Sequence, residues 1–443
     1  MNILKKLYLH ERFFNYLSII VIAFLLSFWF SIFYSIAWFM VIVLSVIFLM
    51  DIYLLFKIKN GIQANRILGN KFSNSDENKV PISIKNNYNF TIEIKIIDEL
   101  PVQFQKRDFL QMANIKALGN YNFEYKVTPF ERGEYFFGNL NIYVSSFFNM
   151  VSKRYKFQQN YKVAVYPSYL QMRKYEFLAM SNRLTEFGLK KIRRIGHTLE
   201  FEQIKNYVNG DDVRTINWKA TAKKAQLMVN QFQDEKSQPI YSIIDVGRVM
   251  KMPFEGLKLL DYAINATLAF SNIAIKKNDK AGLITFAKKV NSIVAASNKK
   301  THVNTINEAL YNIDTNFMDA DFGYLYAVIK RTVKQRSLIM LYTNFEHISS
   351  LKRQLTYLQA ISKHHLLVVV FFENTEIQNL LNENAEDLQT IYHKTIAEKF
   401  DYEKKLIVKE LERRGIYAIL TKPKNLTLNV INKYLEFKSK GFI

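Results

Sequence analysis

The chain has 443 residues, of which 49% are hydrophobic, so it can bury a large core and is not globally disordered. It contains no cysteine, which excludes disulfides, thiolate nucleophiles and cysteine-based metal sites. Its formal net charge is +22, and lysine and arginine are spread along the whole chain. A nucleic-acid-binding module usually gathers its cations on one face, so the charge favours contact with an anionic membrane surface and predicts no specific nucleic-acid binding.

The N-terminal region is apolar over a length that fits two membrane spans. Asp51 is the only charged residue between Phe13 and Phe56. As a single helix this run would measure roughly 66 Å, about twice the ~30 Å hydrocarbon core of a bilayer. We therefore expect two transmembrane helices, near 13–31 and 36–56, joined by a tight turn.

Basic residues flank this apolar run on both sides, whereas the turn between the two spans carries no charge. Lys5, Lys6 and Arg12 precede the run, and Lys57 and Lys59 follow it. The positive-inside rule then places both ends of the helical hairpin in the cytoplasm. The expected location is the inner (cytoplasmic) membrane, crossed twice, with both termini and the main domains cytoplasmic.

The next region, residues 61–167, contains short segments in which polar and apolar side chains alternate with period two, as in half-buried strands. These segments are 80–84, 91–96, 121–127 and 140–144. Turn residues separate them and no strong helical pattern intervenes. We therefore expect a small β-sandwich-like domain after the transmembrane hairpin of residues 1–60.

The C-terminal region, residues 236–443, alternates apolar strands with helical patterns and follows a connector over 168–235. The expected strands are 240–245, 281–286, 338–343, 366–372 and 416–420. The expected helices are 254–277, 302–312, 322–335, 349–362, 380–413 and 425–438. This alternation predicts an α/β domain with a doubly wound, mostly parallel sheet and an antiparallel edge strand at 291–296. The charged stretch 383–414 is expected to be the solvated face of an amphipathic helix.

The connector carries a dense group of polar and aromatic residues. Its members are Tyr207, Gly210, Asp211, Asp212, Arg214, Asn217, Trp218 and Lys219. The Gly-Asp-Asp run can turn the chain and cap a short helix, and Arg214 can pair with Asp211 or Asp212. Two interpretations stay open. The residues form either an internal Asp–Arg brace with Trp218 packed against the sheet, or a recognition surface for a partner.

An ordered set of motifs over residues 125–345 resembles the domain of unknown function 58 family. The motifs include Gly196 to Phe201, Tyr207 to Ala222, the strand that ends at Asp245, and Asp279 to Phe286. The resemblance implies a von Willebrand factor A-like domain, tethered to the membrane through a β-domain. It also implies partnership with an AAA+ ATPase of the MoxR type.

Von Willebrand factor A-like domains often hold a divalent cation through an Asp-x-Ser-x-Ser motif, whose oxygens suit Mg²⁺. Here both serines are replaced, and an asparagine stands where a later aspartate is expected. The degenerate positions are Asp245, Gly247, Val249, Thr343 and Asn344. We therefore predict no metal and no cofactor. Thr315, Asp319 and Asp321 could each supply an oxygen from another loop, which would allow weak Mg²⁺ binding.

The sequence contains no Walker A, Gly-x-Ser-x-Gly or His-Glu-x-x-His pattern. We predict a bacterial, membrane-anchored, non-enzymatic adaptor that works with a MoxR-type AAA+ ATPase in the assembly or maturation of protein complexes. Its other partners would be the lipid bilayer and membrane or client proteins. One alternative is a hydrolase that uses Asp245, Asn344 and His347. The other is an outward-facing, metal-dependent adhesion module.

Overall fold

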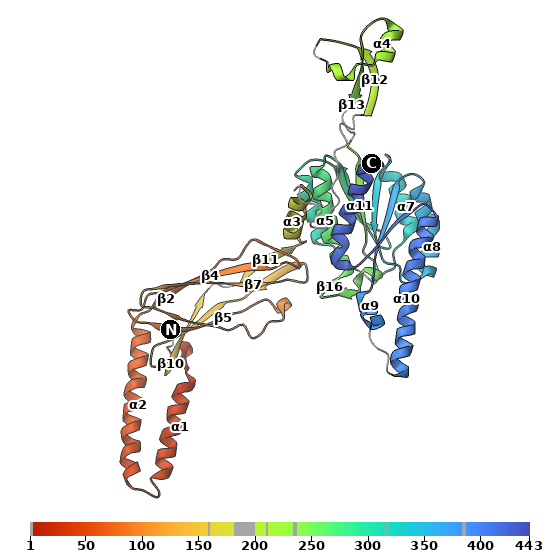
Figure 1. Cartoon of the computed structure of the whole chain (residues 1–443). Coiled ribbons are helices and arrows are strands. Elements are labelled where there is room, and N and C mark those ends of the chain that lie inside the picture. Colours follow the sequence, from red (N-terminus) through yellow and green to blue (C-terminus); the bar gives the residue numbers. More distant parts are fainter. Residues whose placement is uncertain are drawn as a thin grey trace. The chain divides into compact units, whose positions relative to one another are not determined.

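The computed structural model describes residues 3–157, 160–180, 200–209, 211–233, 237–315, 317–382 and 387–443. The chain divides into two units, Met1–Tyr166 and Pro167–Ile443. Helices and sheets are mixed in the chain (Figure 1), which confirms the predicted α/β class. The finer division into four domains stays a prediction.

Two apolar helices, α1 (Glu11–Leu26) and α2 (Ile32–Lys57), lie side by side in the first unit (Figure 1). Their bounds lie near the expected spans of 13–31 and 36–56. Among the described residues, only α2 is long and apolar enough to cross a membrane. With 16 residues, α1 is shorter than the ~20 that a span usually needs. The structure therefore contains one helix with the character of a membrane span or signal sequence.

The only charged residue of α2's apolar run, Asp51, is fully buried and fixes the helix to the strands. One carboxylate oxygen accepts a hydrogen bond from the Ser146 hydroxyl. The other accepts from the backbone N–H groups of Met150 at 3.0 Å and Val151 at 2.9 Å. A buried carboxylate is tolerated when donors satisfy it, so this residue joins α2 to strand β10 (Val151–Phe157).

Three sheets make up the rest of the first unit, with strand orders β1-β10-β9-β5-β6, β3-β11-β8 and β2-β4-β7. The other strands are β1 (Leu7–Leu9), β2 (Ile62–Arg66), β3 (Lys71–Ser73), β4 (Asn78–Asn86), β5 (Ile92–Asp98), β6 (Gln111–Ile115), β7 (Asn120–Val127), β8 (Gly133–Phe137), β9 (Leu140–Ser145) and β11 (Tyr161–Tyr166). Burial alternates along β4 and β5, as the period-two pattern predicts. The inward-facing Ile84 of β4, Ile94 of β5 and Ile142 of β9 share one core.

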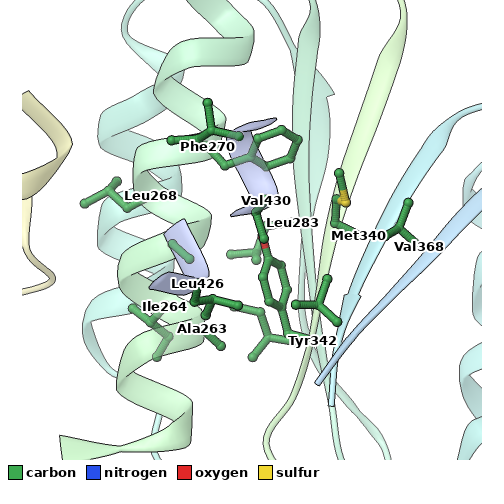
Figure 2. Close-up of a cluster of buried hydrophobic side chains, with 14 of the residues drawn as sticks. Ala263, Ile264, Leu268, Phe270, Leu283, Met340, Tyr342, Val368, Leu426 and Val430 are labelled. Atoms are coloured by element: carbon green, nitrogen blue, oxygen red, sulfur yellow. The ribbon is translucent and has the colours of Figure 1, made fainter. Parts of the chain in front are cut away.

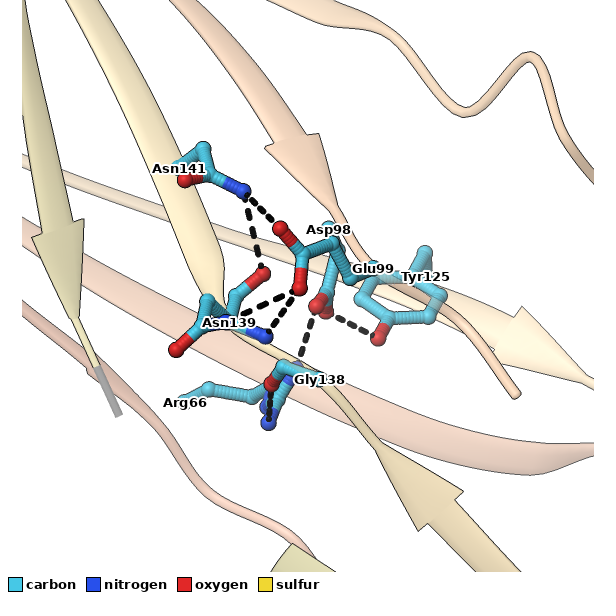
Figure 3. Close-up of polar contacts among 7 residues, drawn as sticks. All are labelled: Arg66, Asp98, Glu99, Tyr125, Gly138, Asn139 and Asn141. Carbon is cyan, nitrogen blue, oxygen red and sulfur yellow. Dashed lines mark hydrogen bonds and ion pairs between the residues drawn. The ribbon is translucent and has the colours of Figure 1, made fainter. Parts of the chain in front are cut away.

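A buried polar cluster joins β2, β5 and β7 in this unit (Figure 3). The Arg66 guanidinium pairs with Asp98 and donates to the carbonyl of Gly138 at 3.0 Å. The Tyr125 hydroxyl donates to the second oxygen of Asp98 at 2.5 Å. Burial raises the pKa of Asp98, while Arg66 and Tyr125 act against the rise. Both oxygens of Asp98 are engaged within the cluster, whereas the Nε–H of Arg66 has no partner among the described residues. We assign the cluster a structural role.

The second unit contains a six-stranded sheet with the order β18-β17-β14-β19-β20-β21. Its strands are β14 (Pro239–Asp245), β17 (Lys280–Phe286), β18 (Val290–Ser297), β19 (Leu338–Tyr342), β20 (Leu366–Phe372) and β21 (Tyr417–Thr421). All neighbouring pairs are parallel except β17 with β18, which is antiparallel. The expected antiparallel edge strand at 291–296 is therefore present as β18. A short hairpin, β15 (Pro253–Phe254) and β16 (Leu257–Lys258), follows β14.

Helices cover both faces of this sheet (Figure 1). One face carries α5 (Leu259–Lys276), α6 (His302–Tyr311) and α11 (Leu426–Ser439). The other carries α7 (Phe322–Thr332), α8 (Ile348–Ser362) and α10 (Leu388–Arg413). Successive residues of a strand point to opposite faces, so Ile244 belongs to the first core and Ile243 to the second. Figure 2 shows side chains of α5, α11 and the strands meeting in the first core.

The second unit also contains α3 and α9, besides the short α4 described below. α3 (Tyr169–Met180) packs on α5. α10 confirms the helix expected over 380–413 from Leu388 onward, and its start differs from the expected one. α9 (Thr375–Asn382) is a separate helix that overlaps the expected range only at its end.

Candidate functional site

The carboxylate of Asp245 lies at the carboxyl end of β14 and is closed in by its neighbours. The Thr343 hydroxyl donates to one oxygen at 2.7 Å, and the Gly247 N–H donates to the other at 2.8 Å. Burial raises the pKa of Asp245 to about 6, although both hydrogen bonds favour the carboxylate and act against the rise. The side chain is buried and both of its oxygens are engaged, so it supports the strand end and offers little to a ligand.

The strand end lacks both serine oxygens of the Asp-x-Ser-x-Ser motif, because Gly247 and Val249 stand at their positions. A Cβ added at Gly247 would lie 3.0 Å from the Asp245 carboxylate and 3.0 Å from the Met318 carbonyl, so a serine needs a backbone shift there. Val249 packs against the first core, and the side-chain oxygen of Asn344 accepts a hydrogen bond from a lysine at 2.7 Å. Across the described part of the chain, no three His, Cys, Asp or Glu side chains form a metal-binding group.

The three further oxygens expected near this site have other surroundings. Asp321 caps α7 by accepting from the Tyr324 N–H at 2.9 Å. Asp319 lies 3.5 Å from the Arg248 guanidinium, and both side chains are exposed. The Thr315 hydroxyl is buried without a hydrogen-bond partner in the described residues. The charge of Asp319 adds to the rise in the pKa of Asp245, so this carboxylate lies close enough to interact with it.

A pocket of about 360 Å³ opens at the carboxyl ends of β19 and β20. Its apolar lining is Met252, Phe254, Leu259, Phe372, Ile377 and Phe400. Its polar lining is Asn344, Glu346, His347, Glu373, Asn374, Asp401 and Lys404. This volume lies in the lower part of the ~300–1,000 Å³ range of small-molecule sites. The carboxyl edge of a parallel sheet is also where such folds bind ligands.

The most unusual group in this pocket is the ammonium of Lys404, on α10. It donates to the Asn344 side-chain oxygen at 2.7 Å and to the Phe345 carbonyl at 2.6 Å. Burial lowers its pKa to about 8, and the charge of Glu346 acts in the opposite direction. No carboxylate of the described residues lies within ion-pair distance of it. The pocket therefore contains a half-buried cation without a contacting counter-ion.

Residues 388–413 form the expected amphipathic helix, but Lys404 does not belong to its solvated face. Phe400, Ile407 and Leu411 occupy the same stripe of α10, at the i, i+3 and i+4 spacing of one helix face. Lys404 lies within that stripe. The spacing of these residues was visible in the sequence, but the charged character of the stretch as a whole concealed it.

The residues of the hydrolase alternative are only partly brought together. Asn344 and His347 line the pocket, whereas Asp245 is not among its lining residues. The His347 ring nitrogen lies 3.0 Å from a Glu403 carboxylate oxygen, and the ring lies against Phe400 at 5.3 Å between centroids. Two residues of α10 thus hold His347, which precedes α8.

The connector residues fold into a separate hairpin of β12 (Glu200–Asn206) and β13 (Met228–Gln233). Between the strands lie a 3₁₀ turn (Val213–Thr215) and α4 (Trp218–Lys224). The amide of Asn217 caps α4 through the Ala220 N–H at 3.0 Å and donates to Asn230 of β13 at 2.8 Å. These contacts hold the short helix to the hairpin.

The predicted Asp–Arg brace is wrong, because the cation is a different residue. Lys205 of β12 donates to Asp211 at 2.9 Å, and the Val208 N–H donates to the other oxygen at 3.0 Å. The hydrogen bond from Lys205 lowers the pKa of Asp211. Asp212 caps the 3₁₀ turn through the backbone N–H of Arg214 at 3.0 Å. In the described residues, the Arg214 guanidinium has no carboxylate partner and is exposed.

The prediction that Trp218 packs against the sheet is also wrong. Its side chain is 70% exposed, and Val213, in the preceding turn, is 64% exposed. Lys219 is exposed beside it, whereas Tyr207 is half-buried and its N–H donates to the Leu227 carbonyl at 2.8 Å. Two parts of the signature lie outside the described residues, Gly210 and the segment 196–199.

Comparisons with known proteins support the resemblance. Residues 203–382 match the family model described as protein of unknown function DUF58. The uncharacterized protein YeaD of Bacillus subtilis (strain 168) is 24% identical over 169 residues, which cover 38% of this chain. The matched part spans only 39% of that relative's length. The DUF58 resemblance is thus confirmed over the hairpin, the Asp245 strand end and the lining of the pocket as far as α9.

Solved structures give weaker likenesses. The conserved hypothetical protein BatB from Bacteroides thetaiotaomicron is 13% identical with a TM-score of 0.32, over 46% of this chain and 100% of that chain. PapD-like domain 7 of human CEP192 is 7% identical with a TM-score of 0.17, over 24% of this chain and 83% of that chain.

Proposed function

We propose, from the match of residues 203–382 to the DUF58 family, that this chain is a bacterial membrane-anchored adaptor without enzymatic activity. Its second unit is a von Willebrand factor A-like domain that binds a MoxR-type AAA+ ATPase in the assembly or maturation of protein complexes. The ATPase supplies the energy, and this chain supplies recognition and tethering. The partner class rests on the resemblance of the signature residues.

The observation that carries this proposal is the hairpin surface, which we define by Val213, Arg214, Trp218, Lys219 and Lys223. An exposed tryptophan next to an exposed valine is costly to leave in water, and tryptophan and arginine are the residues that most often dominate binding interfaces. The hairpin is fixed by its own caps and by the Lys205–Asp211 pair. The surface is therefore preformed, and its cations suit an acidic partner.

Membrane anchoring is supported by the burial of α2. Only 17% of its most apolar window is buried, whereas the core helix of a soluble protein is mostly buried. The hydrogen bonds that Asp51 accepts from Ser146, Met150 and Val151 make α2 part of the folded unit, which argues against a removable signal sequence. α1 lies alongside it with exposed apolar side chains and completes the proposed two-pass hairpin. Apolar side chains on both helices are then covered by lipid.

The topology has a direct test. A reporter that is active only in the periplasm should be silent when fused after Ile443, because the basic flanks keep both ends of the helical hairpin in the cytoplasm. Strong activity from that fusion would overturn the cytoplasmic placement, and with it the ATPase partnership.

The partnership is tested by purification of the tagged full chain from membranes in mild detergent, with identification of co-purifying proteins. We expect an AAA+ ATPase with the wild type, and its loss with Trp218→Ala. Tyr392→Ala is the matched control, since Tyr392 is an aromatic residue of similar exposure on α10. Absence of any ATPase, or equal capture by all three chains, would contradict the proposal.

A further inference from the structure

The pocket at the ends of β19 and β20 combines apolar walls with a cation that has no counter-ion among the described residues. Phe254, Phe372 and Phe400 line it together with Lys404. Partly buried charges are normally paired, because an unpaired charge in a low-dielectric site costs free energy. Lys404 uses two of the three hydrogens of its ammonium group on Asn344 and Phe345. The third hydrogen has no hydrogen-bond acceptor among the described residues, and the ring of Phe371 lies 5.7 Å from the ammonium.

We propose that this pocket binds an acidic side chain of a partner protein together with an adjacent apolar side chain. The partner's carboxylate accepts the third hydrogen of Lys404, and the apolar side chain packs between the phenylalanines. The inference rests on the proposed adaptor function, because it assigns a second contact to the same partner. It differs from a metal-mediated contact, since the cation is part of the chain.

Within the lining, Lys404 is the group that attracts a carboxylate, although three carboxylates line the pocket with it. Asp401 is paired with Lys405 at 2.7 Å, and Lys404 is the one lysine or arginine among the lining residues. The chain's net charge of +22 attracts acidic surfaces and repels basic ones at long range. Glu346 and Glu373 also line the pocket and oppose an incoming anion. They make the proposal testable, because their removal should strengthen the binding of a carboxylate and weaken that of an amine.

The test uses two probes of the same shape and opposite charge, 3-phenylpropanoate and 3-phenylpropylamine. The full chain is labelled with ¹³C at the methionine methyl groups and placed in nanodiscs of zwitterionic lipid. Met252 lines the pocket and reports binding, whereas Met340 lies in the first core and serves as the internal control. We expect the propanoate to shift the Met252 signal and to bind about tenfold more tightly than the amine.

Two variants complete the test. Lys404→Met keeps the length of the side chain and should weaken propanoate binding about tenfold, whereas Glu346→Gln should strengthen it about twofold. If Lys404→Met misfolds, the Met340 signal will show it, and Glu346→Gln together with the paired probes still decides the outcome. Tighter binding of the amine, unchanged propanoate binding in Lys404→Met, or weaker propanoate binding in Glu346→Gln would each overturn the proposal.

The assay contains no ATPase, so its failure is distinguishable from failure of the adaptor function. Loss of the propanoate signal with intact ATPase capture refutes the pocket alone. If the pocket binds propanoate but no ATPase is captured, the pocket proposal stands and the ATPase partnership is refuted.

Discussion

Asp245 and Asp211 are both carboxylates within conspicuous motifs, and the fold gives them opposite surroundings. Burial at the end of β14 raises the pKa of Asp245, whereas a hydrogen bond from Lys205 on the exposed hairpin lowers that of Asp211. At the end of β14, Thr343 and Gly247 satisfy both oxygens of Asp245. On the hairpin, polar contacts stabilise the turn and leave the apolar and basic side chains outside. The comparison teaches that the sheet edge is largely closed around Asp245, while the hairpin is open to a partner.

The largest expected difference between the two regions concerns their aromatic side chains. Phe286, at the end of β17, is fully buried and packs on Phe322 at 5.4 Å between ring centroids. Phe286→Ala should lower the unfolding free energy by about 3–5 kcal/mol through the cavity that it leaves. Trp218→Ala should change it by less than about 0.5 kcal/mol. Denaturant unfolding of both variants measures this contrast, and a large loss in Trp218→Ala would show that the hairpin surface is part of a core.

The next largest effect is a pH dependence of the unfolding free energy, which Asp245 causes. Its pKa rises from 3.8 to about 6 on folding, so the unfolded state ionises first. Stability from this group is complete below pH 3.8, declines as the pH rises to about 6, and is constant above. Between pH 4 and pH 7 the loss should be about 2 kcal/mol.

Asp245→Asn should remove that dependence. The measurement is the difference in unfolding free energy between the wild type and the variant at several pH values. Asp211→Asn is the matched control, because its folded pKa is lowered and its contribution therefore has the opposite sign. A difference between the wild type and Asp245→Asn that is independent of pH would show that Asp245 is not closed off from solvent.

A smaller effect on stability is expected at the basic residues of the hairpin surface. Arg214 has no carboxylate partner among the described residues, so Arg214→Ala should leave the melting temperature unchanged. Lys219→Glu should do the same, yet it should weaken ATPase capture because it reverses a charge on the surface that we propose for binding. Full capture by Lys219→Glu would remove this residue from the interface, and a clear loss of stability in Arg214→Ala would restore the brace.

No effect at all is expected from metal removal. Gly247 and the engaged oxygen of Asn344 leave the strand end without a set of free ligands. Chelator should leave the melting temperature unchanged, and millimolar Mg²⁺ should not raise it, although a ligand at 100 times its dissociation constant would add about 2.7 kcal/mol. A rise of several degrees with Mg²⁺ would show that the strand end rearranges to bind the ion.

The elements themselves could be predicted from the sequence because their signals are local. The apolar run Ile240–Asp245 and the period-two pattern near Ile82 and Ile84 each need only a few consecutive residues to be recognised. The same is true of the missing serines at Gly247 and Val249. Backbone hydrogen bonding and side-chain alternation impose these patterns within one element. A single sequence is therefore enough to recognise them.

The partners of individual side chains were decided by tertiary structure alone. Lys205 precedes Asp211 by six positions and reaches it because the hairpin folds back. Arg214 is nearer to Asp211 in the sequence, so it was the expected partner. Lys404 meets Asn344 across 60 positions, because the packing of α10 turns one stripe of that helix towards the end of β19. Contacts between elements depend on how two surfaces fit together, and no local pattern in the sequence specifies that fit.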